Sequence, residues 1–322
     1  MKAIGIRQFG DPGTLEMMAL PRPDAGAGEV LVRVMAGSVN PVDTKIRRGL
    51  FPFSREFPLI LGYDVSGIVE AVGSGVNDFA PGDEVFYMAP LDGPGACAEY
   101  HTVPAEIVSL KPANLSHTEA AALPLAGSTA WQALFERGWM APGMAVLVHG
   151  GAGGVGSMAI QIAAWAGCEV FATASEANLD FLYEMGVDQA LDYGSEDVPE
   201  RLMTLTEGAG MDVVLDTVGG NTFFGSIGAL SAHGQLVGIA PVDLDDPPPG
   251  FFTEALSRNV TLHLLMVEGR RDSLDNLARL VERGLIGPVV NEVVPFQTDR
   301  IQEAHRRLEG GHGRGKIVVE IG

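Results

Sequence analysis

A short apolar run, AVLVHG, leads directly into the glycine-rich sequence GAGGVG, and the apolar segment MAIQIAAWAG follows at helical spacing. Gly151, Gly153 and Gly156 thus stand in G-x-G-x-x-G spacing at a predicted strand-to-helix turn. Small residues there permit a tight turn, close approach of a diphosphate to the backbone, and close packing of helix on strand. This turn, with Gly154 and Val155, is predicted to bind a dinucleotide through helix-start amides. A glycine-rich turn without a ligand is the alternative.

The segments around this turn alternate between strand-like and helix-like patterns. Helical segments end at glycines such as Gly167 and Gly284. The alternation predicts an α/β fold with a doubly wound parallel sheet, a Rossmann domain. The acidic, proline-rich residues 243–250 are predicted to form a surface loop. The predicted strands are AVLVHG, EVFATA, QALDY, DVVLDTVG, QLVGIA and VTLHLLM.

The first 120 residues have a different character, because glycines and prolines interrupt strand-like segments such as EVLVRVMAG, PGDEVFYM and AEYHTVP. After Gly287 the strand-like pieces VVNEVVPF and GKIVVEI flank one predicted helix. We therefore predict a β-rich domain made of residues 1–122 and 288–322. Residues 123–287 are predicted to form the nucleotide-binding domain.

Charge and composition exclude several classes of function. The chain has 41 acidic and 21 basic residues, a net charge of −20, which repels phosphate backbones and anionic lipid surfaces. We therefore expect no nucleic acid and no membrane as partner. The amino-terminal segment lacks the apolar core of a secretory signal, so a cytoplasmic protein is expected. Cys97 and Cys168 are too few for a disulfide framework and are predicted to be buried.

The residues after the second predicted strand bear on the choice of cofactor. NAD-binding domains usually place a carboxylate there to accept the ribose hydroxyls. Here Ala174 takes that place, and the Ser175 hydroxyl can donate to a 2′-phosphate, which favours NADPH over NADH. Against this, Glu176 is adjacent, and no Lys or Arg occurs between Arg137 and Arg201.

Several segments in a fixed order carry a resemblance over nearly the whole chain. The chain resembles the zinc-independent quinone oxidoreductases, the branch of the medium-chain dehydrogenase/reductase superfamily that includes zeta-crystallin. The resemblance implies a GroES-like β-rich catalytic domain beside the Rossmann domain. The segments are AGSVNPVDTKIRRG (36–49), PLILGYDVSGIVEAVGSGVNDFAPGDEV (58–85), AALPLAGSTAWQAL (121–134), HGGAGGVGSMAIQIA, DVVLDTVGG and GRGKIVV.

The resemblance also bears on zinc. The positions that match the catalytic zinc ligands of zinc-dependent relatives hold Asn40, Tyr63 and Leu125, none of which is a good zinc ligand. The lobe that holds structural zinc in those relatives is replaced by the short loop YMAPLDGPGA. We therefore expect no metal. Without a Lewis acid, quinones and conjugated enones, which accept hydride readily, become the expected substrates.

Three residues are candidates for catalysis, each with a structural alternative. By resemblance, the Asn40 amide lies near the nicotinamide and donates to a developing oxyanion; the alternative is a turn residue before Pro41. Asp43 orients Asn40 or relays a proton; the favoured alternative is an N-cap of the helix that follows. Tyr63 is a donor to the substrate oxygen or a packed aromatic residue.

The resemblance assigns further residues to cofactor binding. Thr129 is expected near the nicotinamide, with a helix-capping role as the alternative. Asn178 stands where many relatives have lysine, which weakens the inference of NADPH. Lys316 is expected to contact cofactor, and a solvated charge is its alternative. The remaining candidates lie at the adenosine end, at strand ends or in the carboxyl-terminal tail: Ser175, Tyr193, Thr217, Val218, Gly238, Ile239 and Arg314.

These observations predict a zinc-independent, NADPH-dependent oxidoreductase that transfers hydride to a quinone or an α,β-unsaturated carbonyl compound. A zinc-free alcohol or aldehyde oxidoreductase and a non-catalytic NADPH-binding structural or sensor protein are the alternatives. The family often forms dimers, and an exposed VTLHLLM strand would need covering, so a homodimer is expected.

Overall fold

The computed structural model describes residues 1–51, 56–311 and 313–322 and divides the chain into two units. Unit 1 comprises Met1–Ser128, Glu268–Gly284 and Pro288–Gly322. Unit 2 comprises Thr129–Val267 and Leu285–Gly287, all of them described. None of the helices in the described ranges combines the length and apolar character that a membrane span needs.

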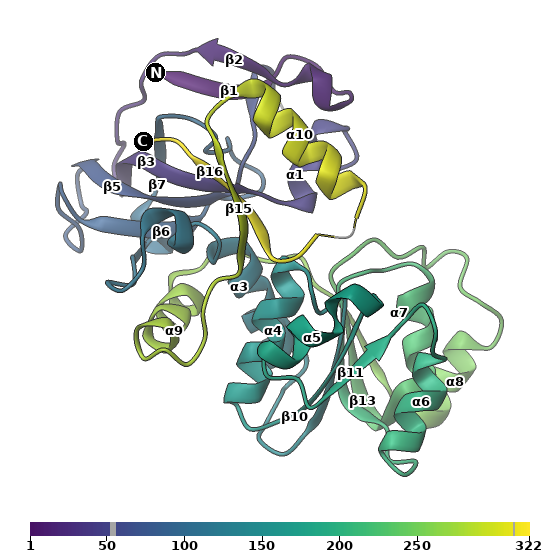
Figure 1. The fold of residues 1–322 in the computed structure, drawn as a ribbon. Helices are drawn as coiled ribbons and strands as arrows, with labels where there is room; N and C mark the ends of the chain where they lie inside the picture. Colours follow the sequence, from purple (N-terminus) through teal and green to yellow (C-terminus); the bar gives the residue numbers. More distant parts are fainter. Residues whose placement is uncertain (52–55, 312) are drawn as a thin grey trace. The chain divides into compact units, whose positions relative to one another are not determined.

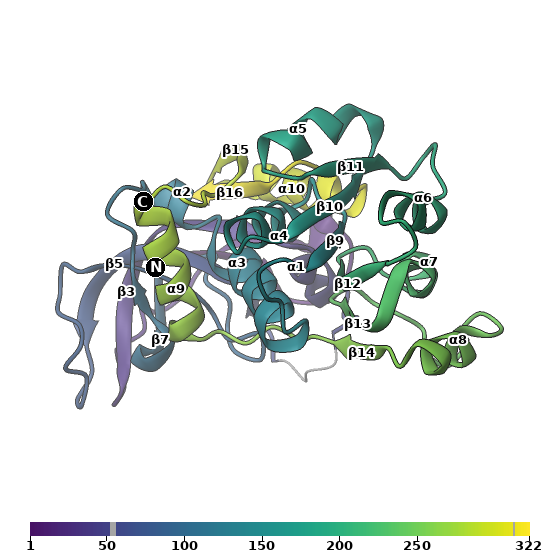
Figure 2. The same ribbon diagram turned by 90° about the horizontal axis from the view of Figure 1, so that it is seen from below.

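Unit 2 is built around a parallel sheet of six strands. The strand order is β11-β10-β9-β12-β13-β14, which Figure 2 shows from top to bottom of the view. The chain winds outward from β9 in one direction and then returns to β12 on the other side, as a doubly wound domain requires. All six predicted strands are confirmed: β9 (Ala145–His149), β10 (Glu169–Ala174), β11 (Gln189–Asp192), β12 (Met211–Asp216), β13 (Leu230–Gly238) and β14 (Thr261–Leu264).

Helices connect these strands and cover the buried centre of the sheet. Leu147 on β9 and Val214 on β12 are fully buried, because parallel strands are covered on both faces. Residues 243–250 form the predicted surface loop before α8. The helices of unit 2 are α4 (Gly154–Trp165), α5 (Leu179–Glu184), α6 (Val198–Leu205), α7 (Asn221–Gly225) and α8 (Phe251–Arg258), with short turns of helix at Gln132–Arg137, Glu176–Asn178 and Ser226–Ala229.

The described residues of unit 1 form a seven-stranded sheet and a three-stranded sheet. The larger has the order β15-β16-β3-β5-β6-β8, with β7 also pairing with β3, and the smaller has the order β2-β1-β4. The strands are β1 (Lys2–Ile6), β2 (Glu16–Ala19), β3 (Glu29–Val39), β4 (Leu59–Ile60), β5 (Asp64–Val72), β6 (Glu84–Met88), β7 (Tyr100–Pro104), β8 (Ser109–Leu110), β15 (Val290–Pro295) and β16 (Lys316–Glu320).

The carboxyl-terminal tail joins the larger sheet beside β3, a strand from the amino-terminal part of the chain. Figure 1 shows the yellow strands β15 and β16 beside the purple β3, and Ile317 of β16 pairs with Val39 of β3 in antiparallel register. The predicted return of the tail to the β-rich domain is therefore observed. The helices of unit 1 are α1 (Pro41–Arg47), α2 (His117–Ala120), α9 (Arg271–Glu282) and α10 (Thr298–Glu309), and α3 (Pro124–Trp131) carries the chain from unit 1 into unit 2.

The predicted boundary at residue 287 misplaces helix α9, which belongs to unit 1. The Ser109 hydroxyl donates to the Asp275 carboxylate at 2.5 Å, and the Asn114 amide donates to the Val281 carbonyl at 2.9 Å. These bonds fasten α9 to the strand β8 and the loop after it. An amphipathic helix pattern shows that one face is buried but not which sheet it covers, and this accounts for the difference.

Candidate functional site

The glycine-rich turn lies between β9 and α4, beside the point where the strand order reverses. Gly150, one residue before the predicted spacing, has φ +72°, so it supplies the left-handed residue of the turn. A Cβ on Gly156 would stand 2.2 Å from the Gly150 carbonyl oxygen, which explains the need for glycine where α4 packs on the turn. A Cβ on Gly151 would lie 2.9 Å from the Leu182 side chain. The spacing found this turn but missed Gly150.

Gly153 differs from its neighbours, because its missing side chain leaves open space. It is the N-cap of α4, with φ −72° and ψ 175°, and an added Cβ would meet only the Gly150 oxygen at 3.4 Å. The amides at the start of this 12-residue helix have no partner within the helix. An open backbone beside unpaired helix-start amides fits the diphosphate of a dinucleotide.

Side chains from neighbouring strands fix the base of the turn. The Thr173 hydroxyl lies 3.1 Å from Nδ1 of His149 and accepts the Gly150 amide at 3.3 Å. The Thr217 hydroxyl donates to the His149 carbonyl at 2.8 Å. Burial lowers the pKa of His149 to about 4, so its ring is neutral at pH 7. Thr217 therefore supports the turn through the backbone of His149.

The remaining strand-end candidates lie on β12 and β13. The Asp216 carboxylate accepts the amides of Val218 at 2.7 Å and Gly219 at 3.0 Å, which shapes the turn after β12 and leaves Val218 55% exposed. A Cβ on Gly238 would lie 2.7 Å from the Phe223 ring, so a larger residue is excluded at the end of β13. The Ile239 amide donates to the Asp216 carbonyl at 3.1 Å.

The predicted adenosine-end residues follow β10 and β11. Ala174 pairs in register with Asp192, which brings the ends of the two strands together. The Asn178 amide donates to the Ser175 hydroxyl at 3.1 Å. Tyr193 is 54% exposed directly after β11. Ser175, Asn178 and Tyr193 therefore belong to two adjacent strand ends.

Unit 1 holds a buried polar network around Asp64, a residue that sequence reasoning missed. Its carboxylate accepts the Asn40 amide at 2.8 Å, the Leu125 backbone amide at 2.6 Å and the Ser38 hydroxyl. The Lys316 ammonium lies 3.1 Å from the same carboxylate and also donates to the side-chain oxygen of Asn40. The side chain of Asp64 is fully buried and that of Lys316 is 6% exposed. The alternative of a solvated charge at Lys316 is therefore wrong.

This network fixes the orientation of the Asn40 amide. Its oxygen accepts from Lys316 and its nitrogen donates one hydrogen to Asp64, which leaves the second hydrogen of the nitrogen for another acceptor. The Lys316 ammonium has three hydrogens and three acceptors, since the Val39 carbonyl at 3.4 Å is the third. Lys316 therefore holds Asn40 in place.

Asp43 supports Asn40 from the backbone side. Helix α1 begins at Pro41 with Asn40 as its N-cap. The prediction that Asp43 is the N-cap is therefore wrong, because Asp43 lies three residues further along the helix. Asp43 lies in the first turn of the helix, where its carboxylate accepts the Asn40 amide at 2.7 Å and the Gly62 amide at 2.8 Å. The sequence predicted the helix start at the aspartate because Pro41 was assigned to a turn, although proline is well suited to the first helical position.

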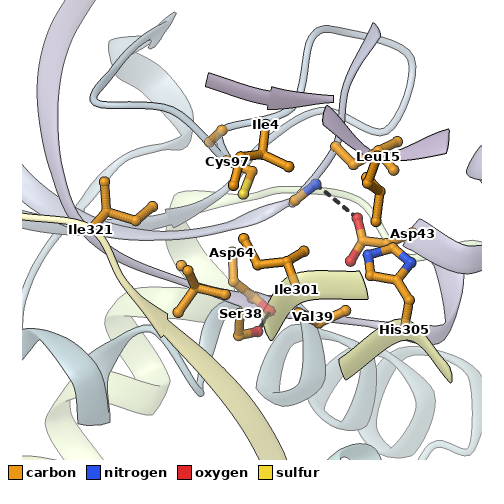
Figure 3. A pocket seen from close by; sticks show the side chains of 15 residues that line it. Ile4, Leu15, Ser38, Val39, Asp43, Asp64, Cys97, Ile301, His305 and Ile321 are labelled. Carbon is orange, nitrogen blue, oxygen red and sulfur yellow. Dashed lines mark hydrogen bonds between the residues drawn. The ribbon is translucent and has the colours of Figure 1, made fainter. Parts of the chain in front are cut away.

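A small cavity of about 20 Å³ lies beside Asp43 inside unit 1, which is room for one water molecule. Its walls are mostly apolar, and Asp43, Cys97 and His305 lie among them (Figure 3). Burial lowers the pKa of His305 to about 3, with the nearby Arg47 as second cause. Cys97 is half-buried, whereas Cys168 is buried as predicted.

The other candidates are placed as follows. Tyr63 is fully buried, so its phenol lies within packed side chains. Thr129 lies inside helix α3 and is 4% exposed, so the alternative of a capping residue is wrong. The sequence pattern placed the helix start too late, because the helix begins at Pro124. Arg314 is exposed in the tail before β16.

The pKa of Asp43 predicts a pH dependence of stability. Burial raises this pKa from 3.8 to about 7, against hydrogen bonds from Asn40 and Gly62 that lower it. A carboxyl group whose pKa is higher in the folded state than in the unfolded state favours folding at low pH. This contribution to the free energy of unfolding is complete below about pH 4 and is lost as pH rises through 7. The loss amounts to at most about 4 kcal/mol.

Asp43→Asn should therefore unfold with a flatter pH profile than the parent chain between about pH 5 and pH 8. Urea unfolding at several pH values measures this, with Asp24→Asn, an exposed carboxylate, as the control. Parallel profiles for the parent and Asp43→Asn would contradict the buried, protonated carboxyl.

The residues at the positions that match the zinc ligands of zinc-dependent relatives do not suit a zinc ion. Asn40 uses its amide oxygen for Lys316, Tyr63 is a buried phenol, and Leu125 offers only its backbone. In the described ranges, no group of three or more His, Cys, Asp or Glu side chains is arranged to hold a metal. The donor set therefore does not fit zinc.

Comparison with known proteins agrees with this architecture. The model of the alcohol dehydrogenase GroES-like domain matches residues 26–113, and that of the zinc-binding dehydrogenases matches residues 185–319. The 2-methylene-furan-3-one reductase of Solanum lycopersicum is 36% identical over 332 residues, which cover 99% of this chain and 79% of that protein. The chain belongs to the quinone oxidoreductase-like branch of the medium-chain dehydrogenase/reductase superfamily.

Two further proteins place this medium-chain reductase within its family. The NADPH-dependent alkenal/one oxidoreductase, chloroplastic, of Arabidopsis thaliana is 34% identical, over 99% of this chain and 79% of that protein. The structure of the quinone oxidoreductase from Coxiella burnetii superposes with a TM-score of 0.89 at 34% identity, over 100% of this chain and 99% of that one. Unit 1 is thus a GroES-like domain and unit 2 a Rossmann domain.

Proposed function

We propose that this chain is a reductase that transfers hydride from NADPH to quinones or α,β-unsaturated carbonyl compounds without zinc. The observation that carries the proposal is the Gly150–Gly156 turn, whose open side at Gly153 suits a diphosphate. The names of the relatives, an enone reductase, an alkenal/one oxidoreductase and a quinone oxidoreductase, support the class of substrate. The donor set around Asn40 supports a reaction without a metal.

The chain's own residues divide the work in this proposal. The amides at the start of α4 bind the diphosphate, and Ser175, Asn178 and Tyr193 bind the adenosine end. The bound nicotinamide supplies the hydride. The second hydrogen of the Asn40 amide donates to the substrate oxygen as negative charge develops there. Asp43, through the Asn40 backbone, acts as a positioning residue.

A turnover assay tests the proposal. The purified chain is mixed with NADPH and either a simple benzoquinone or a short-chain enone, with a chelator present, and loss of reduced nicotinamide is followed by absorbance. We expect turnover with at least one acceptor that the chelator does not reduce. Binding of NADPH without turnover across both classes would favour the non-catalytic alternative, and a requirement for added zinc would contradict the proposal.

A homodimer remains part of the proposal. β14 is an edge strand of the unit 2 sheet, and Leu264 and Met266 at its end are 54% and 51% exposed. A second copy of the chain pairing along β14 would cover them. The molar mass at micromolar concentration decides this, and a monomer would refute it. Cytoplasmic location stays a prediction, since one relative is named as chloroplastic.

A further inference from the structure

The ends of β10 and β11 determine which nicotinamide dinucleotide unit 2 accepts. In Rossmann domains the residues after the second strand face the 2′ position of the adenosine ribose, with a carboxylate for NAD or a cation for the 2′-phosphate of NADP. Here the second strand ends in Ala174 and Ser175, and the neighbouring strand ends in Asp192, in register with Ala174. The feature that matters is therefore the charge around these two strand ends.

Carboxylates surround this place. Asp192 accepts the Gly194 amide at 3.0 Å and the Ser195 hydroxyl at 2.7 Å, and these bonds lower its pKa and keep it ionised. Glu176 and Asp180 are exposed on the segment after β10. The nearest polar contact of Ser175 is neutral, since the Asn178 amide donates to it. The strand ends thus offer neutral donors among negative charges.

The whole of unit 2 has the same sign of charge. Unit 2 has 17 acidic and three basic residues, whereas unit 1 has the other 24 acidic and 18 basic residues. The field of unit 2 therefore opposes the 2′-phosphate, which adds a charge of about −1.5 to −2 to the dinucleotide.

The three arginines of unit 2, all of which is described, are engaged elsewhere or paired. Arg258 donates to the carbonyl of Leu230 at 2.7 Å, at the start of β13. Burial and, second, the charge of Arg137 lower the pKa of His263 on β14, so Arg137 lies near the opposite edge of the sheet. Arg201, one turn into α6, pairs with Glu196 at 3.4 Å. Unit 2 thus brings no uncommitted cation to the strand ends.

We infer that the chain binds NADH at least as tightly as NADPH, because the ends of β10 and β11 present carboxylates and neutral donors and unit 2 brings no uncommitted cation to them. This inference rests on the proposed function and refines its hydride donor. Ser175 and Asn178 still provide hydrogen bonds for a 2′-phosphate, so NADPH remains a substrate. A single positive charge introduced at residue 178 should shift the preference towards NADPH.

The salt dependence of binding tests the inference directly. Dissociation constants of NADH and NADPH are measured by calorimetry with the whole chain, at about 20 mM and about 300 mM salt. We expect NADH to bind at least as tightly at low salt, and added salt to improve NADPH relative to NADH about threefold, because salt screens a repulsion. If cations bound the 2′-phosphate, added salt would instead weaken NADPH binding relative to NADH binding, because salt screens the attraction.

A matched pair of variants assigns the effect to the strand ends. Asn178→Lys should raise the affinity for NADPH relative to the affinity for NADH about 10-fold at low salt. Ser257→Lys adds the same charge on α8, where residue 257 is exposed, and should change either constant less than about twofold. Unchanged unfolding midpoints confirm that both variants are folded.

The outcomes separate this inference from the proposed function. NADPH binding at least about 10-fold tighter than NADH at low salt, with an advantage that salt reduces, overturns the inference and leaves the proposed function standing. Equal effects of Asn178→Lys and Ser257→Lys also overturn it. If neither nucleotide binds, the proposed function fails and the inference fails with it.

Discussion

Lys316→Met is expected to lower the free energy of unfolding of unit 1 by about 3 to 5 kcal/mol. The substitution keeps the apolar stem but removes the ammonium that lies 3.1 Å from the Asp64 carboxylate. Because the Asp64 side chain is fully buried, solvent cannot replace the lost cation. The Asn40 amide also loses the donor to its oxygen. The expected result is a large loss of stability from one side chain.

Two further variants test whether the loss arises from the buried charge. Lys316→Met combined with Asp64→Asn should be more stable than Lys316→Met alone, because no unpaired carboxylate remains. Arg307→Met breaks an exposed pair with Glu292, whose side chains are 45% and 41% exposed, and should cost at most about 1 kcal/mol. Equal losses for Lys316→Met and Arg307→Met would contradict the buried ion pair.

The distribution of tryptophans allows the two units to be followed separately. Trp131, Trp139 and Trp165 all lie in unit 2. Urea unfolding of Lys316→Met should therefore shift the transition seen by far-ultraviolet circular dichroism and leave the tryptophan fluorescence transition in place. A shift in fluorescence alone would show that the damage lies in unit 2.

Gly153→Ala is expected to weaken binding of NADPH and NADH at least about 100-fold while leaving the folded chain intact. The backbone of Gly153 is extended, so alanine adopts it without strain, and the added Cβ meets only the Gly150 oxygen at 3.4 Å. The methyl group therefore occupies the side on which we propose that the diphosphate approaches the backbone. Calorimetric titration of the nucleotide measures the loss.

Gly225→Ala is the matched control for this prediction. Gly225 also lies in unit 2, has helical angles, and a Cβ added there meets nothing within 4 Å. Both variants should keep the unfolding free energy within about 0.5 kcal/mol of the parent chain, and only Gly153→Ala should lose nucleotide binding. Binding that survives in Gly153→Ala would refute the proposed role of the turn.

The sequence predicted unit 2 well because its signals are local. Each strand, from Ala145–His149 to Thr261–Leu264, is a short run of β-branched and apolar residues, and the glycine turn follows the first of them directly. Unit 1 was predicted less completely. β1 and β2 lie in an amino-terminal segment whose weak alternation was not recognised, and α9 was assigned to the wrong unit.

The buried network around Asp64 could not be predicted as a network. Asn40, Asp64 and Lys316 are brought together by pairing among β3, β5 and β16, and 252 residues separate Asp64 from Lys316. No periodicity relates positions so far apart. A signal was present, because Asp64 and Lys316 each begin a strand whose next residues are mostly apolar, DVSGIV and KIVV. A charge at such a position is rarely buried without a partner.

The pairing of β16 with β3 has a consequence for synthesis of the chain. Lys316 follows Val39 by 277 residues, so at ordinary elongation rates roughly 15 to 60 seconds pass before the ribosome delivers the partner of β3. Residues 129–267 emerge within that interval as one continuous stretch and contain every strand of their own sheet. The Rossmann domain is therefore complete first, while residues Ala36–Val39 of β3, which pair with β16, stay open to pairing with other chains until translation reaches the last strand.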